Sequence, residues 1–541
     1  MPLKNSLNFI NEFFSLVFKQ IRKFYLSSSF YNKKISKIDS KSLIYKPTLS
    51  ILSCLIKYDK KKNKLEDFNI ESIWKNNISS EKDYKKLHSF YWLFSIDLKS
   101  SKKVTQKIIE NWIDKNQNYN SKSWKIEILS KRIISWISNY KLTYEESKNY
   151  YKIKFDKIVN KQTNHLIYEI IRSDSDDDKM LGCTAIVIAG LSYNNDKFLS
   201  YGLILLKKII GSSFDNQYFP KTRSFRHLIF YLKYFVLIRE LLKESLNEIP
   251  EYLDEIIFYL GKSYDLFSKT KESFLFNGNH NSNLSDFNKY LNLHRYKFNN
   301  SVNEVGGYAL LKNKNSMICV DVGSSPSKKF SESYQSGTLA FEFIYKGQKL
   351  ICNSGYYQDY KNKLNLISKY TASHSTIIID NKSACSFNLL KNKPSLLSKG
   401  LKIQDKNIVF ENNLWIIKAS HDGYVNNYGV IHERTLEYYP DYYKIRGKDK
   451  LIKKNNFKST NFEIRFHVMP GTKLTKTQDN KNILIELENS GWKFNTNSGS
   501  INIETGLYFG TKNKTNENQN ICISGITNNK DQQIEWELVK I

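Results

Sequence analysis

The chain has 541 residues, a formal net charge of +30, 40% hydrophobic residues and 25% charged residues. This length corresponds to roughly two to four domains and allows a large core, which excludes a small disulfide-held or disordered polypeptide. The positive charge indicates either a polyanionic partner or a bias toward AT-rich codons. We favour the bias, because Lys, Asn, Ile, Tyr and Phe are abundant while Pro and Trp are scarce.

Neither the basic residues nor the cysteines gather in one place. Lys and Arg are spread along the chain, whereas a nucleic-acid-binding arm is a local cluster, so we expect no nucleic-acid partner. The six cysteines include no C-x-x-C pair, which excludes a zinc knuckle and a dense disulfide framework. Buried free thiols are the expected state.

The N-terminal segment has an amphipathic pattern. Its apolar residues between Leu7 and Phe18 are interrupted by Asn11 and Glu12, which differs from the unbroken apolar core of a signal peptide. Such a helix can make peripheral contact with a membrane surface, bind a partner, or pack on its own domain. We expect it to pack on its own domain.

The region from about 84 to 275 reads as consecutive amphipathic helices joined by short polar connectors, which is typical of bundles, solenoids and toroids. The acidic run 173–178 is expected to begin one of these helices, in preference to binding a cation. The clearest apolar periodicities cover residues 87–98, 104–114, 124–140, 181–191, 198–210, 227–242 and 252–267.

After about residue 300 the pattern changes to short runs rich in β-branched and aromatic residues, separated by Gly, Asn, Lys and Ser. Many short strands at regular spacing predict a β-sandwich or barrel. We therefore divide the chain into an N-terminal helical extension (1–80), a helical domain (81–300) and a strand-rich domain (301–541). Clear strand patterns lie at 316–322, 339–345, 376–380, 408–410, 414–419, 443–446, 462–468 and 483–487.

Several ordered motifs resemble the heparinase II/III-like polysaccharide lyase superfamily. The resemblance spans roughly residues 80 to 510 and is carried by blocks 337–357, 370–377, 421–434 and 446–449, together with His88 to Leu93 upstream. It implies an α+β multidomain fold, with an N-terminal α/α toroid-like domain followed by an antiparallel β-sandwich.

The resemblance also implies a reaction. Members of the superfamily cleave acidic polysaccharides by β-elimination, in a cleft between the two domains. The reaction needs a group that neutralises the uronate carboxylate, a base that removes the neighbouring proton and an acid that protonates the leaving oxygen. Tyr and His can transfer the protons, and Arg, Asn, Gln or His can stabilise the charge.

The sequence departs from the family at the positions expected to carry chemistry. Where the family has a His-x-His-x-Asp run this chain has 333–337, Ser-Tyr-Gln-Ser-Gly, and Asn353 stands at the position of a metal-binding Asp. Of the expected zinc ligands only His374 remains, so we expect no zinc and no other cofactor. In the helical domain, Arg226 stands at the position of a catalytic Tyr, with Tyr218 and His227 as substitutes.

The candidate site residues follow from these alignments, and a packing or surface role stays open for each. We assign catalytic roles to His374, Tyr356 and His227, and substrate binding to Arg223, Arg226, Gln335, Asn353 and Tyr357, with no metal ligands. Strand alternation places His432 and Arg434 on one face and Glu433 on the other. We expect Arg434 and Asp449 to form a structural ion pair instead.

Two functions remain open. One is a polysaccharide lyase acting on an acidic, uronate-containing glycan, and the other is a catalytically degenerate glycan-binding or envelope-assembly protein. The resemblance implies the cell envelope or periplasm, whereas the lack of a clear signal peptide leaves a cytoplasmic location open. The substrate, its sulfation and the oligomeric state do not follow from the sequence.

Overall fold

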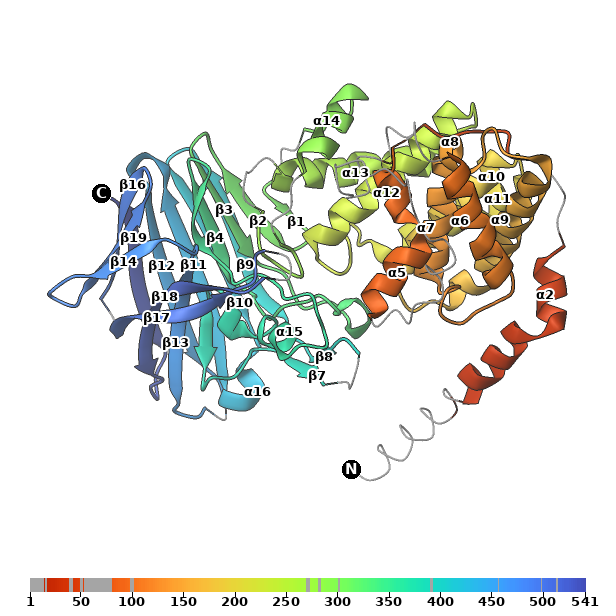
Figure 1. The fold of residues 1–541 in the computed structure, drawn as a ribbon. Coiled ribbons are helices and arrows are strands. Elements are labelled where there is room, and N and C mark those ends of the chain that lie inside the picture. Colours follow the sequence, from red (N-terminus) through yellow and green to blue (C-terminus); the bar gives the residue numbers. More distant parts are fainter. Residues whose placement is uncertain are drawn as a thin grey trace. The chain divides into compact units, whose positions relative to one another are not determined.

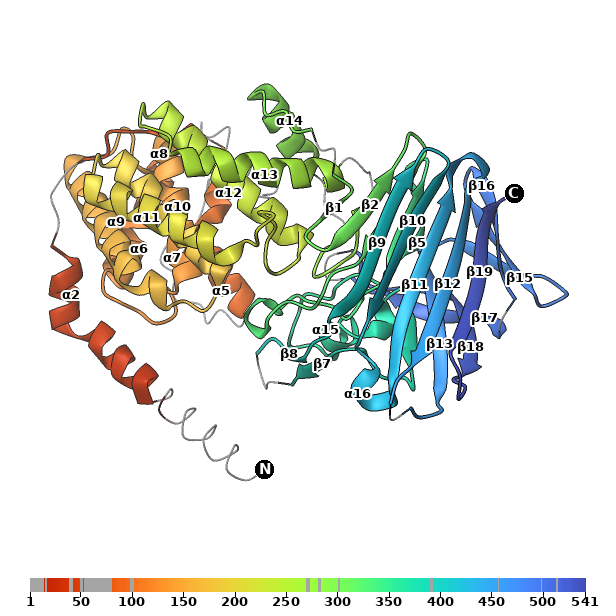
Figure 2. The same cartoon turned by 180° about the vertical axis from the view of Figure 1, so that it is seen from behind.

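The structure is a computed structural model. It describes residues 14, 17–37, 42–48, 52, 80–97, 102–268, 273–280, 284–299, 302–389, 393–455, 457–497, 499–511 and 514–541. The chain forms two compact units whose segments alternate along the sequence. Unit 1 contains residues 1–212, 231–257 and 286–294, and unit 2 contains 213–230, 258–285 and 295–541. Figures 1 and 2 show most helices in red to green and the strands in green to blue.

Unit 1 is helical, as the apolar periodicity predicts. Ser175 caps α10 by accepting the backbone N–H of Asp178, and the predicted acidic run fills the first turn of that helix. Among the described residues, no helix has the length and apolar content needed to cross a bilayer. The helices are α2 (Ser29–Ile35), α5 (Glu81–Ser89), α6 (Lys102–Asn116), α7 (Ile126–Ser138), α8 (Tyr140–Thr143), α9 (Asn149–Glu169), α10 (Asp176–Ser192), α11 (Asp196–Ser213), α12 (Phe225–Glu244), α13 (Glu251–Ser268) and α14 (Ser285–Leu293).

One predicted helix, over residues 87–98, is divided in the structure. Helix α5 ends at Ser89, because Phe90 adopts a left-handed conformation with φ of 57°, and a short 3-10 helix (Tyr91–Ser95) follows. The turn buries Phe90 between two indoles, with ring centroids 6.0 Å from Trp112 and 5.1 Å from Trp136. Aromatic packing therefore overrides the apolar periodicity at this point.

The expectation that the N-terminal helix packs on its own domain is wrong for the residues that the structure describes there. Phe14, Val17 and Phe18 are all exposed. The rest of that prediction, including Leu7, lies outside the described residues.

Unit 2 contains an antiparallel β-sandwich. Within the described residues, one sheet has nine strands in the order β1-β2-β3-β4-β5-β13-β18-β17, with β6 also paired to β13, and the other has eight in the order β14-β15-β16-β19-β12-β11-β10-β9. A separate hairpin pairs β7 with β8. The strands are β1 (Glu304–Val305), β2 (Tyr308–Lys312), β3 (Ser316–Asp321), β4 (Phe341–Tyr345), β5 (Gln348–Cys352), β6 (Ile377–Ile379), β7 (Ser386–Asn388), β8 (Leu396–Lys399), β9 (Ile403–Glu411), β10 (Leu414–His421), β11 (Val430–Tyr439), β12 (Lys444–Lys453), β13 (Asn461–Val468), β14 (Lys473–Lys476), β15 (Asn482–Leu487), β16 (Ser490–Thr496), β17 (Ser500–Tyr508), β18 (Asn516–Ile526) and β19 (Gln532–Lys540).

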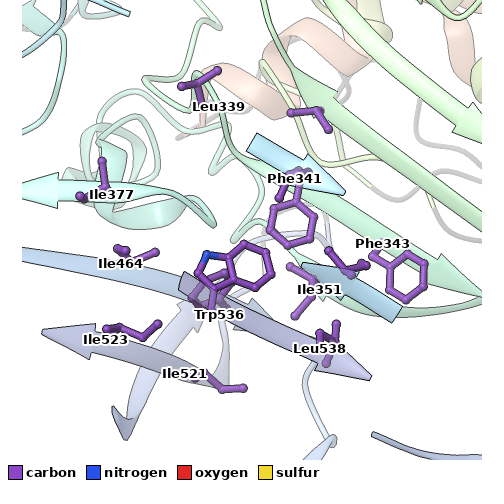
Figure 3. Close-up of a cluster of buried hydrophobic side chains, with 14 of the residues drawn as sticks. Leu339, Phe341, Phe343, Ile351, Ile377, Ile464, Ile521, Ile523, Trp536 and Leu538 are labelled. Carbon is purple, nitrogen blue, oxygen red and sulfur yellow. The ribbon is translucent and has the colours of Figure 1, made fainter. Parts of the chain in front are cut away.

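The core of unit 2 lies between these two sheets. Figure 3 shows Phe341 of β4 facing Trp536 of β19, and their rings stack at 5.7 Å between centroids. Strand β11 alternates strictly between buried and half-buried residues, so one face of the strand enters the core. The predicted fold class, a helical domain and an antiparallel sandwich, is confirmed. The five described cysteines are free and buried, as expected.

A buried polar cluster lies inside this core. Arg434 donates from Nε to Asp449 at 2.7 Å and from Nη2 at 3.0 Å, which confirms the predicted ion pair. Asp449 also contacts His432 Nε2 at 2.7 Å and accepts the Trp536 indole N–H at 2.9 Å. Burial opposes its charge, but Arg434 and His432 hold the pKa of Asp449 well below its usual range.

Candidate functional site

The strand exit after β5 sets the position of the first candidate, Tyr356. Gly355 has a φ of +85°, and a Cβ there would lie 2.7 Å from the backbone nitrogen of Gly510, so only glycine fits. The Tyr356 ring is 8% exposed, and its hydroxyl donates to the backbone carbonyl of Glu332 at 3.3 Å. The adjacent Tyr357 is half-buried, with its ring centroid 5.9 Å from that of Phe509.

The environment of Tyr356 keeps its phenol protonated. Burial raises the pKa of Tyr356 to about 12, with a further increase from the charge of Glu332, whereas Asn365 and Arg226 act in the opposite direction. A phenol in this state is a proton donor at neutral pH. The charge of Arg226, in the first turn of α12, therefore acts on this phenol.

Arg226 and His227 occupy that turn side by side and are both half-buried. Arg226 Nη2 lies 2.8 Å from His227 Nε2, and His227 Nδ1 lies 2.8 Å from Thr222 Oγ1. Because a guanidinium can only donate, His227 Nε2 accepts, and the ring proton is on Nδ1 facing the threonine. The imidazole is therefore neutral. The structure brings Arg226 and His227 into contact, and we group them with Tyr356, on whose phenol the Arg226 charge acts, as the edge group.

Arg223, in contrast, is enclosed. Its guanidinium donates to Asp321 at 2.6 Å and to the carbonyls of Gly306, Gly307, Gly323 and Ser324 at 2.9–3.3 Å, so all five N–H groups have protein acceptors. Burial opposes its charge, but Asp321 raises the pKa of Arg223 above its ordinary value. This placement favours a structural role over the predicted binding of substrate.

Gln335 and Asn353 are also fully engaged. Gln335 donates to the carbonyls of Gly355 at 2.9 Å and Ser368 at 2.6 Å, and its oxygen accepts the N–H of Gly278 at 3.1 Å. The Asn353 amide donates to Glu342 at 3.2 Å and accepts the N–H of Ser375 at 3.0 Å. Both side chains hold loops of the sandwich in place.

His374 is 1% exposed and lies against Gly337, where a Cβ would come within 2.4 Å of the imidazole. Its Nδ1 donates to the Tyr370 carbonyl at 3.0 Å, while the buried Nε2 has no hydrogen-bond partner among the described residues. Burial lowers the pKa of His374 to about 4, although its contacts with Tyr370 and Thr371 act in the opposite direction. His374 is a neutral interior side chain and does not join the edge group.

These residues do not fit a zinc site. Gln335 and Asn353 direct their oxygens to backbone N–H groups, so the single open nitrogen of His374 is the only ligand that the three supply. Among the described residues, the group of His, Cys, Asp or Glu side chains with metal-ligand spacing is Glu463, Glu504 and Cys522. It contains no candidate site residue, and Arg465 already pairs with Glu463 at 2.9 Å.

Sequence reasoning missed several supporting groups. Glu342 and Lys349 form a buried ion pair at 2.7 Å, and Glu342 also accepts the N–H of Leu275 at 3.2 Å. Lys349 donates to the Ser273 carbonyl at 2.6 Å. The only available signal was a glutamate between two phenylalanines in β4. Thr222, Glu332 and Asn365, which surround the edge group, carried no sequence signal.

Comparisons with solved structures identify the fold as that of polysaccharide lyases. A mutant of the heparan sulfate lyase HepC from Pedobacter heparinus matches with a TM-score of 0.70 and 12% identity, covering 95% of this chain and 87% of that one. A heparinase III structure gives a TM-score of 0.68 with 13% identity over 94% and 89%. A Streptomyces coelicolor chondroitin AC lyase gives 0.52 with 7% identity over 95% and 83%.

The family model for the heparinase II/III-like C-terminal domain matches residues 300–537. The C-terminal part of this protein is therefore similar to that domain, which confirms the resemblance indicated by the motifs for this part of the chain. A search of curated proteins gives no match.

Proposed function

We propose that the protein is a polysaccharide lyase that cleaves an acidic, uronate-containing glycan by β-elimination, with the edge group as its reactive centre. The observation that carries the proposal is the contact of the Arg226 guanidinium with the His227 imidazole, at 2.8 Å, in the electrostatic vicinity of the protonated Tyr356 phenol. These are the three functions that the reaction needs: an acid, a carboxylate neutraliser and a base.

In this mechanism the substrate carboxylate binds Arg226 in a charge-assisted pair. In the free protein Arg226 Nη2 lies 2.8 Å from His227 Nε2 and donates to its lone pair. When the carboxylate replaces His227 as the acceptor, this lone pair becomes free. His227 Nε2 then removes the proton from the carbon next to the carboxylate. Tyr356 gives its proton to the departing sugar oxygen as that carbon–oxygen bond breaks, and a carbon–carbon double bond forms in the uronate. Binding of the carboxylate thus activates the base.

The test is the ultraviolet absorbance of unsaturated uronate, measured with the full chain on heparan sulfate, heparin, chondroitin sulfate, hyaluronan, alginate and pectate. We expect product from at least one glycan. Tyr356→Phe and His227→Gln should each lower kcat by about 100-fold or more. Tyr442→Phe, at a tyrosine that is 73% exposed, is the matched control and should keep full activity. Full activity of Tyr356→Phe would refute its role as the acid.

The burial of His374 supports a second candidate function, a glycan-binding protein without catalysis. His374 is 1% exposed, and Arg223, Gln335 and Asn353 have their polar groups occupied by the protein, so four of the eight candidate residues are closed to substrate. This candidate predicts saturable glycan binding without unsaturated product. Arg226→Ala would then abolish binding, while Tyr356→Phe would leave it unchanged.

A further inference from the structure

The helix before α2 exposes an apolar face. Residues 17–27 are helical, and the side chains of Phe14, Phe18, Ile21 and Phe24 are 56%, 70%, 59% and 77% exposed. Residues spaced by three or four lie on one side of a helix, and Val17, which is also exposed, follows the same spacing. We call Val17, Phe18, Ile21 and Phe24, with Phe14 beside them, the apolar N-terminal face. Isolated exposed apolar residues are common, but a continuous stripe rich in phenylalanine indicates a binding surface.

The segment that carries this face is attached to α9 of the same unit. Leu26, Tyr31 and Ile35 are buried, and the Tyr31 hydroxyl lies 2.8 Å from His165 Nδ1. Arg22 forms an ion pair with Glu169, in which Nε lies 3.2 Å from the carboxylate. In Figures 1 and 2 the red segment before α2 runs away from the orange and yellow helices. The buried side chains are therefore different from those of the apolar N-terminal face, which are exposed.

The segment that carries this face is rich in positive charge, although Arg22 is paired with Glu169. Residues 17–37 contain no Asp or Glu, and their basic side chains are Lys19, Arg22, Lys23, Lys33, Lys34 and Lys37. An amphipathic helix with phenylalanine on one side and Lys or Arg beside it matches an anionic bilayer surface, where the rings enter the acyl region and the cations meet the headgroups. A second copy of the chain fits less well, because a symmetric dimer would bring the two cationic segments against each other.

We propose that the apolar N-terminal face binds an anionic lipid surface, with residues 17–27 lying in the plane of the membrane interface. The phenylalanines supply the apolar contact, and Lys19 and Lys23 supply the attraction to acidic headgroups. The α9 attachment, through Tyr31 and Arg22, then holds unit 1 at the membrane. This inference does not depend on lyase activity.

The test uses the full chain in co-sedimentation with vesicles of phosphatidylcholine, alone or mixed with phosphatidylglycerol. We expect binding to the mixed vesicles that falls as salt is added. Phe18→Glu/Phe24→Glu should weaken it at least tenfold. Leu246→Glu/Leu293→Glu is the matched control, with the same added charge at positions that are 95% and 78% exposed, and should bind like the parent.

Two further measurements separate the sources of the effect. In a Phe18→Trp variant, indole fluorescence should shift to shorter wavelength on mixed vesicles and stay unchanged on phosphatidylcholine. Lys19→Glu/Lys23→Glu should lose the preference for acidic lipid. The proposal is overturned if the parent does not bind mixed vesicles, or if Phe18→Glu/Phe24→Glu binds them as well as the control. It is also overturned if light scattering shows that the parent is a dimer and that Phe18→Glu/Phe24→Glu alone is monomeric.

Discussion

The polar groups inside the sandwich and those of the edge group share residue types but differ in how they are satisfied. Inside, Arg434 and Gln335 have buried protein partners, and His374 is enclosed with its one proton bonded to a carbonyl. In the edge group, Arg226 and His227 are half-buried and bonded through a contact that an arriving carboxylate can replace. The difference indicates that the motif blocks which carry the family resemblance mainly specify the fold, whereas the proposed reaction uses groups whose polar bonds can be exchanged.

Acidification should produce the largest effect on the interior. Burial lowers the pKa of His374 to about 4 and that of His467 to about 3. Because the folded-state pKa values lie below the unfolded value of about 6.5, the stabilisation is complete above that pH and is lost as pH falls toward 3–4. Once both imidazoles are protonated, the two shifts correspond to a loss on the order of 8 kcal/mol. Urea denaturation between about pH 7 and about pH 4 measures most of it. His374→Gln should flatten the dependence, and an unchanged slope would contradict the burial of a neutral imidazole.

Removing the central carboxylate of the core should have the next largest effect. Asp449→Ala leaves Arg434 charged and buried without its partner, so we expect a loss of about 3–5 kcal/mol in the free energy of unfolding. Glu486→Ala is the control, since its ion pair with Lys473 is more than half exposed on both sides. An exposed pair contributes about 0–1 kcal/mol. Equal melting temperatures for the two variants would show that the interior ion pair stabilises the fold no more than the surface ion pair.

A neutral side chain in the same interior should have a smaller effect. Gln335→Ala leaves the Gly278 N–H and the Gly355 and Ser368 carbonyls without partners, which costs about 1–3 kcal/mol. The matched control is Gln348→Ala, whose side chain bonds Glu488 at the surface. We expect thermal unfolding to separate the two variants, and glycan binding by folded Gln335→Ala to match the parent. Loss of binding with unchanged stability would restore Gln335 as a substrate ligand.

The smallest stability change is expected in the edge group. Tyr356→Phe removes one long hydrogen bond, of 3.3 Å to Glu332, so the free energy of unfolding should fall by only about 0.5–1.5 kcal/mol. Activity should nevertheless be lost. Measuring both properties on the same preparation therefore sharpens the comparison. A variant that loses stability and activity in proportion would place Tyr356 with the structural residues.

The sequence supported the fold better than the site. Periodicity located most helices and strands, and the predicted ion pair between Arg434 and Asp449 is present. It did not predict that α5 ends at Ser89, because the left-handed turn at Phe90 depends on indoles contributed by other helices. For the same reason the sequence did not show that Arg223 is enclosed whereas Arg226 is half-buried. The acceptors that enclose Arg223 come from around residues 306 and 321, and their proximity is created by the fold.

The placement of Arg223 also limits how the gene can be divided. Arg223, which pairs with Asp321 of β3, comes from residues 213–230. Leu275, whose backbone N–H binds Glu342 of β4, comes from residues 258–285. A fragment that starts at residue 300 would expose Asp321 and Glu342 without these contacts, although it would contain the whole family match. Expression of the sandwich as a separate protein therefore requires two earlier segments of the chain, residues 213–230 and 258–285. Truncation at a single position cannot include both segments without the unit 1 residues between them.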